Sequence, residues 1–150
     1  MDYIKEAENY LRNYNDLVDS VDNLKNEIYE INADLTSIKN IDYSGMPHGS
    51  GGALPDDKLI NKLYRKQKAE EELKKTLIAI NRIDCVLKKL SEGEDNKKYE
   101  KILRLYYIEG ARGQALEEAL ECSERHCYRL KGIAIRRLAV QLFGIKGLGE

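Results

Sequence analysis

The chain has 150 residues, of which 42% are hydrophobic and 34% charged, and its formal net charge is −1. This length suits one domain or two small ones. No stretch approaches the roughly 18 to 20 continuous apolar residues that a membrane span needs, and the polar start of the chain is unlike a signal peptide. A net charge this close to zero does not by itself mark a nucleic-acid-binding protein.

The near-neutral total hides a difference between the two parts of the chain. Residues 1–95 carry 14 basic and 19 acidic side chains, whereas residues 96–150 carry 11 basic and 7 acidic ones. The three cysteines lack the spacing of a disulfide framework or a metal site, so we expect reduced thiols and no metal or other cofactor. The excess of basic side chains in the last third indicates that the two parts have different tasks.

Two long segments with helical periodicity flank one loop. Apolar residues recur at steps of three and four from Ile4 to Ile38, with one phase slip at Val21–Leu24, and again from Leu59 to Leu90. Each segment predicts a helix of about 35 residues, about 50 Å long. Both prolines and four glycines fall within residues 42–56, so the loop is placed at about 40–56.

Charge favours an antiparallel pairing of these two segments. Residues 1–38 hold 9 acidic and 3 basic side chains, whereas residues 56–92 hold 7 acidic and 10 basic ones. A narrow apolar seam between helices of opposite charge is typical of a coiled coil. We therefore expect an all-α protein whose first domain, residues 1–92, is an antiparallel coiled-coil hairpin.

Shorter elements follow Gly93, in a second domain predicted at residues 93–150. Apolar spacing predicts a helix from Tyr99 to Ile108 that stops at Gly110, and a second one around Leu116–Leu120. Ser123 is a favourable N-cap for a third and longer helix. A short helix, a tight turn and a longer helix that begins with a serine cap are typical of a helix-turn-helix.

The third helix carries the candidate DNA-binding residues. From Cys122 through Lys146 the sequence has six basic residues and one acidic residue. With Cys127 and Ala134 turned inward, the outward positions near the helix start are base-reading candidates: Glu124, Arg125, Tyr128 and Arg129. Candidates for phosphate contact are Ser123, Lys131, Arg136 and Arg137. The alternative from the residues alone is a solvated basic helix packed on its neighbours.

The strings Tyr106–Gly110, Leu116–Leu120, Ser123–Leu130 and Ala134–Leu138 resemble region 4 of sigma-70-type factors. With the loop Asp-Tyr-Ser-Gly-Met-Pro-His-Gly at residues 42–49, most of the chain resembles the phage late transcription activators of the ArpU/RinA type. The resemblance implies a regulator of phage or prophage genes that binds double-stranded DNA in the cytoplasm of a bacterial host. It also suggests host RNA polymerase as a partner.

Two residues depart from the pattern of that family. Glu117 stands where the family usually has a small alanine, and Glu121 stands where it usually has a glycine with positive φ. We expect Glu117 to tilt outward and Glu121 to alter the turn slightly. If the geometry is unchanged, each substitution costs about 1 kcal/mol of local stability.

Other functions find less support in the sequence. The glycine-rich loop lacks the Lys-Ser/Thr ending of a phosphate-binding loop, and the chain has only two histidines and no catalytic constellation, so we expect no enzyme and no small-molecule substrate.

Tyr43, Met46 and His48 form either a flexible loop tip or a patch that contacts a partner. The hairpin is a spacer, a homodimer interface or a polymerase contact. Alternatives for the whole chain are a coiled-coil protein-interaction module and a DNA-packaging or architectural subunit.

Overall fold

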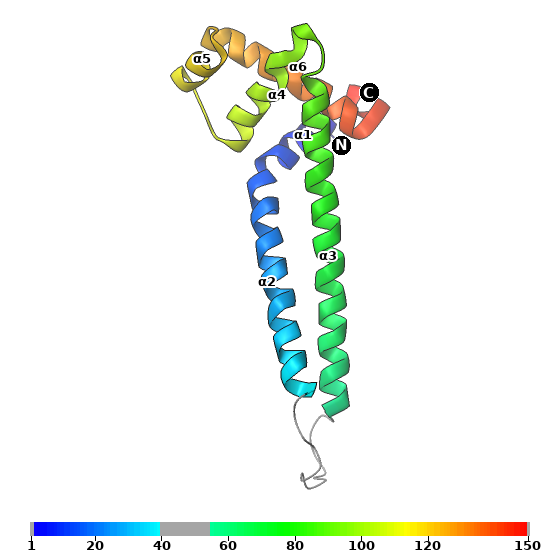
Figure 1. Ribbon diagram of the computed structural model, residues 1–150. Coiled ribbons are helices and arrows are strands. Elements are labelled where there is room, and N and C mark those ends of the chain that lie inside the picture. The colour runs from blue at the N-terminus through cyan, green and yellow to red at the C-terminus, as the bar shows by residue number, and fades with distance from the viewer. Residues whose placement is uncertain (1, 40–54, 150) are drawn as a thin grey trace. The chain divides into compact units, whose positions relative to one another are not determined.

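The computed structural model describes residues 2–39 and 55–149, which are mostly helical and contain no strand (Figure 1). This confirms the all-α expectation. Short 3-10 segments cover Glu94–Asn96 and Gly144–Leu148, and a π-helical segment covers Arg104–Ile108. The α-helices are α1 (Tyr3–Arg12), α2 (Tyr14–Lys39), α3 (Pro55–Leu90), α4 (Lys97–Leu103), α5 (Gln114–Leu120) and α6 (Glu124–Phe143). The loop residues Tyr43, Met46 and His48 lie outside the described residues.

The first predicted helix is in fact two helices that meet at Asn13. Asp2 caps α1 by accepting hydrogen bonds from the amides of Ile4 and Lys5. At the other end Asn13 leaves the helical conformation, with φ −91° and ψ 2°. Asparagine is a weak helix former, so a break costs little at this position. The three- and four-residue spacing of apolar residues continues across Asn13. The spacing alone therefore does not reveal that the helix is interrupted there.

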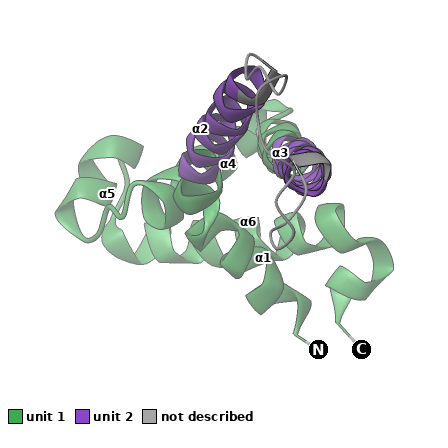
Figure 2. Ribbon diagram, turned by 90° about the horizontal axis from the view of Figure 1, so that it is seen from below, with its two compact units in different colours: residues 1–18, 79–150 green, residues 19–78 purple. Residues whose placement is uncertain are grey.

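The contacts divide the chain differently from the expected boundary at residues 92 and 93. One compact unit comprises residues 1–18 and 79–150, and the other comprises residues 19–78 (Figure 2). We call them unit 1 and unit 2. The helix α1 belongs to unit 1 because it packs against α6 and the segment that follows α6. The last turns of α3 also belong to unit 1.

The core of unit 1 is formed by apolar side chains from both ends of the chain. Leu11 of α1, Leu87 and Leu90 of α3, Leu103 of α4 and Leu138 of α6 are fully buried in one cluster. The hydroxyl of Tyr107 donates a hydrogen bond of 2.9 Å to the Glu8 carboxylate at the edge of this cluster. The C-terminal helices therefore share their core with α1 and with the end of α3.

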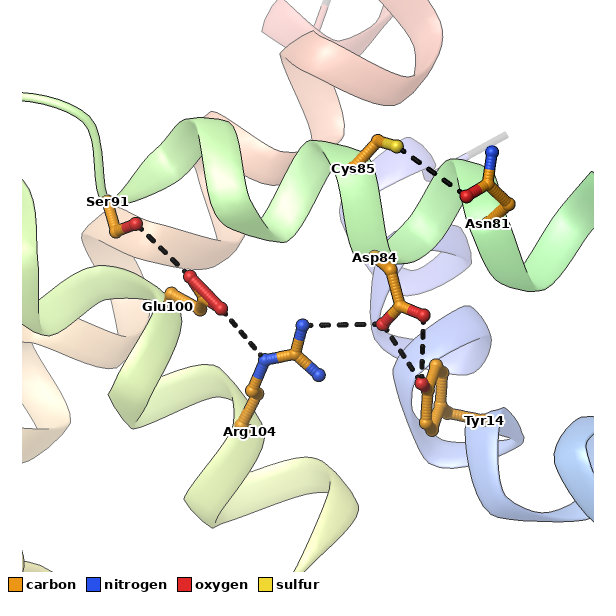
Figure 3. Close-up of polar contacts among 7 residues, drawn as sticks. All are labelled: Tyr14, Asn81, Asp84, Cys85, Ser91, Glu100 and Arg104. Atoms are coloured by element: carbon orange, nitrogen blue, oxygen red, sulfur yellow. Dashed lines mark hydrogen bonds and ion pairs between the residues drawn. The ribbon is translucent and has the colours of Figure 1, made fainter.

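A partly buried polar network also connects these elements within unit 1 (Figure 3). The carboxylate of Asp84 accepts hydrogen bonds from the Tyr14 hydroxyl at 2.9 and 3.1 Å and from the Arg104 guanidinium at 3.3 Å. Arg104 also donates to Glu100 at 3.1 Å, and Glu100 accepts from the Ser91 hydroxyl at 3.1 Å. Because these residues come from the start of α2, the end of α3 and the region of α4, the network stabilises the arrangement of all three.

Unit 2 consists of parts of α2 and α3 that run in opposite directions (Figure 1). Val21, Ile31 and Leu35 of the predicted apolar stripe are buried, as is Ala69 of α3. An ion pair of 3.1 Å joins Lys62 of α3 to Asp34 of α2. Apolar burial and opposite charge thus both contribute to the contact between these two helices.

Candidate nucleic-acid interface

The turn between α5 and α6 is short and comprises only residues 121–123. Glu121 follows α5 in the left-handed region, with φ 55° and ψ 39°. Ser123 then caps α6, its hydroxyl oxygen accepting a hydrogen bond of 3.2 Å from the His126 amide. The predicted N-cap is confirmed. The glutamate at position 121 keeps the positive φ that a glycine would have adopted there without strain.

Glu117 does not tilt away into solvent. Its side chain is half-buried, and Oε1 accepts a hydrogen bond of 2.8 Å from the amide of Glu124, the first residue of α6. A carboxylate is favourable at this position because the N-terminus of a helix carries a partial positive charge. Glu117 and Ser123 together satisfy two free amides of α6, so Glu117 supplies a second cap. The sequence interpretation missed this role because the partners belong to different helices.

The buried and the exposed faces of α6 are those that the sequence predicts. Cys127, Ala134 and Leu138 are buried in the core of unit 1, while Leu130 is half-buried. The predicted base-reading side chains, Glu124, Arg125, Tyr128 and Arg129, are all exposed. Within the described part of the chain no ion pair involves Arg125 or Arg129. The first turns of α6 therefore present two uncompensated guanidinium groups to solvent.

A cluster of tyrosines and cations borders this surface. The Lys131 ammonium lies 4.1 Å from the ring centre of Tyr106 and 5.5 Å from that of Tyr128, and the Arg112 guanidinium lies 3.5 Å from the centre of Tyr106. Tyr106 and Tyr128 meet edge to face at 6.1 Å. Cation–π contacts of this kind stabilise both partners. Because Tyr128 and Lys131 are three residues apart on one helix, the sequence indicates that these two side chains can meet. Tyr106 and Arg112 are brought to the same cluster only by the fold.

The four predicted phosphate-contacting residues differ in their availability. Arg136 is exposed, whereas Arg137 is half-buried with its guanidinium 5.2 Å from the ring centre of Tyr99. Lys131 is half-buried over the tyrosines described above. Ser123 uses its oxygen as a cap, which leaves its hydroxyl proton able to donate to another acceptor. Arg136 is thus the most accessible cation of this set.

Comparisons with protein-family models, with curated proteins and with solved structures found no match. Among the residues that the structure describes, no helix is long and apolar enough to span a membrane. In the same ranges, no group of three or more His, Cys, Asp and Glu side chains is arranged to hold a metal ion.

Two cysteine thiols lie close together, one in the turn between α5 and α6 and the other in α6. The sulfur atoms of Cys122 and Cys127 lie 3.1 Å apart, and Cys127 is fully buried. Burial and, to a smaller extent, the hydrogen bond with Cys122 raise the pKa of the Cys127 thiol to about 11. Burial, followed by the hydrogen bond to Glu8, likewise raises the pKa of the Tyr107 hydroxyl. The fold therefore favours the neutral forms of both groups.

These pKa shifts predict a loss of stability at alkaline pH. Because the thiol pKa is higher in the folded chain, its contribution is complete below the unfolded value, 9.0, and is lost as the pH rises to about 11. We expect the free energy of unfolding, measured by urea titration, to fall across this range. The Cys127→Ala and Tyr107→Phe variants should each show a smaller fall. An unchanged pH dependence in both variants would contradict this assignment.

The left-handed conformation of Glu121 predicts a stabilising substitution. Glycine adopts φ 55° without the steric cost that a side chain incurs, so Glu121→Gly is expected to raise the free energy of unfolding by about 0.5–1 kcal/mol. Denaturant unfolding measures this change. Glu118→Gly, at an exposed helical position in α5, is the matched control and should lower stability by about 0.5–1 kcal/mol. A destabilised Glu121→Gly variant would show that another interaction of this side chain outweighs the backbone strain.

Proposed function

We propose that this protein is a sequence-specific DNA-binding transcription regulator that inserts α6 into the major groove of double-stranded DNA. In this proposal α5, the turn at Glu121 and α6 form a helix-turn-helix. The observation that carries it is that Arg125 and Arg129 are exposed on the first turns of a helix whose opposite face is buried, and that neither forms an ion pair with any residue that the structure describes. Arginine can bind guanine through two hydrogen bonds, and glutamate at position 124 can accept from cytosine.

Contacts with the DNA backbone are assigned to cations on and beside α6. Arg136 is exposed and free to contact a phosphate, while Lys131 places positive charge next to Tyr128 and Arg112 places it next to Tyr106. The N-terminus of α6 itself contributes less than in many anion sites, because Glu117 brings a carboxylate to it. Binding would therefore depend on side-chain cations and fall with increasing salt.

The resemblance to sigma region 4 and to ArpU/RinA-type activators extends the proposal to late genes of a phage or prophage in a bacterial host. The helices α2 and α3 are assigned to an antiparallel coiled-coil hairpin, and RNA polymerase is the expected protein partner. These assignments depend on the sequence resemblance and on the antiparallel helices of unit 2.

The direct test is selection of bound fragments from the source phage or host genome with the full-length protein. We expect the recovered fragments to share a sequence motif. Binding to the motif should weaken steeply with salt, by a slope of about 0.9 for each phosphate contacted. Recovery of fragments without a common motif would favour an architectural or packaging role. Absence of binding at every salt concentration would favour a protein-interaction module instead.

A further inference from the structure

Two of the three cysteines form a close pair at the start of α6. The sulfur atoms of Cys122 and Cys127 lie 3.1 Å apart, and the Cys127 sulfur also lies 3.8 Å from the carbonyl oxygen of Cys122. A disulfide bond is about 2.05 Å long, so the two sulfurs need to approach by only about 1 Å to be joined. Because both residues belong to one short segment, this approach requires a small change within the segment and no repacking of helices.

The backbone around the pair keeps the two thiols together. Ser123 and Glu117 cap the first turn of α6, each accepting a hydrogen bond from one of its amides. Cys122 precedes the cap residue and Cys127 is the fourth residue of the helix, two positions at which apolar side chains commonly pack as a hydrophobic staple. A staple requires only apolar groups. Two thiols held in this way can also react with each other at a high effective concentration.

The two thiols differ in their access to solvent. Cys122 is half-buried, whereas Cys127 is fully buried. Since burial raises the pKa of the Cys127 thiol to about 11, this thiol is neutral near pH 7 and is a weak nucleophile. An oxidant that arrives from solvent therefore meets Cys122 first, and Cys127 lies beside it as the second thiol.

We propose that Cys122 and Cys127 form a site of reversible thiol oxidation whose oxidant is a small hydroperoxide. The Cys122 sulfur attacks the outer oxygen of the hydroperoxide and the O–O bond breaks. Cys122 becomes a sulfenic acid, and the alcohol leaves with the thiol proton, or water leaves in the case of hydrogen peroxide. The Cys127 sulfur then displaces the hydroxyl group from the Cys122 sulfur, which forms the S–S bond and releases water with the Cys127 proton. The two thiols lose two electrons and two protons, which the hydroperoxide accepts.

The disulfide closes a ring around the cap and the first turn of α6. It joins the residue before Ser123 to the fourth residue of the helix, so it restricts fraying of the residues between them. We expect amide hydrogen exchange in the segment 124–127 to become several-fold slower on oxidation. Oxidation thus increases order at the start of α6. The proposal does not depend on DNA binding.

The first test oxidises the full-length Cys85→Ser protein with hydrogen peroxide. Cys85 is exposed on α3, where its sulfur lies 3.8 Å from the Asn81 side-chain oxygen (Figure 3), so its replacement removes a competing thiol. We expect the free-thiol count to fall from two to none and the mass to fall by two hydrogen atoms. Dithiothreitol should restore both thiols, and peptide mapping should locate the bond. Addition of two oxygen atoms to Cys122 without a disulfide, or interchain disulfides alone, would overturn the proposal.

The second test determines the order of the two steps with single variants of the Cys85→Ser protein. Cys127→Ala should accumulate a sulfenic acid at Cys122 that dimedone captures. Cys122→Ala should react much more slowly, because its remaining thiol is buried. Equal rates in the two variants would contradict the assigned order. The mass measurement requires no substitution in the core, so it decides the proposal even if Cys127→Ala does not fold.

Hydrogen exchange followed by mass spectrometry tests the structural consequence. The reduced and the oxidised Cys85→Ser proteins are compared over peptides that cover the start of α6. Slower exchange confined to this segment is the expected result. Peptides from unit 2 serve as the internal control and should exchange at the same rate in both forms. Unchanged or faster exchange at the start of α6 in the oxidised protein would show that the disulfide does not order the first turn.

Discussion

A fragment of residues 93–150 is expected to be unfolded in isolation, although its sequence pattern resembles an independent helix-turn-helix domain. The fragment lacks Leu11, Ile83, Leu87 and Leu90, which lie fully or almost fully buried in the same core as α4 and α6. Burial of each such side chain contributes about 1.5–3 kcal/mol. Their combined loss is comparable with the whole stability of a typical domain, about 5–15 kcal/mol.

Circular dichroism and thermal unfolding test this expectation. The matched control is a rearranged chain in which residues 79–150 are followed by a Gly/Ser linker and then by residues 1–18. It restores every element of unit 1, and α1 contacts the segment Gly144–Leu148 that precedes the linker. We expect cooperative unfolding of the rearranged chain only. Cooperative unfolding of residues 93–150 alone would show that the shared core is not required.

Replacement of Arg125 or Arg129 by alanine is expected to weaken binding to the selected DNA motif by about 1–3 kcal/mol, or roughly 5- to 150-fold. Both side chains are exposed, so the substitutions remove donors to base edges without opening a cavity in the core. Affinity for a scrambled duplex of equal length should change much less. Fluorescence anisotropy at a single salt concentration measures both affinities.

Arg136→Ala serves as the control for a backbone contact. This exposed arginine lies farther along α6, where it is assigned to phosphate, so its loss should weaken motif and scrambled DNA alike. It should also reduce the salt dependence by a slope of about one. If Arg125→Ala and Arg129→Ala instead reduce binding equally on both duplexes, these two residues do not read bases.

The elements that sequence predicts well are those governed by neighbours along the chain. The start of α6 follows from the serine at position 123, whose hydroxyl reaches an amide only three residues away. Its buried face follows from the spacing of Cys127, Ala134 and Leu138, which the helical repeat places on one side. The apolar stripe of residues 21–35 predicts burial in α2 for the same reason.

The roles of Glu117 and Lys131 depend on which helices meet in space. The carboxylate of Glu117 caps a helix other than its own, and Lys131 lies over a tyrosine 25 positions earlier in the chain. Neither contact has a local pattern, because the partner is brought near only when α4, α5 and α6 pack together. An exposed charge and a buried or half-buried one look the same in sequence.

The sequence by itself determined the helical class, the cap and faces of α6 and the basic character of the last third, since these depend on composition and on short-range periodicity. Only the tertiary structure decided where the compact units divide. The spacing of apolar residues indicates that a helix has a buried face, but it does not indicate which element covers that face. In the structure the break at Asn13 separates α1 from α2, and α1 packs on α6. The same packing decided which cations of α6 stay exposed, because tyrosines from elsewhere in unit 1 engage Lys131 and Arg137 but leave Arg125, Arg129 and Arg136 exposed.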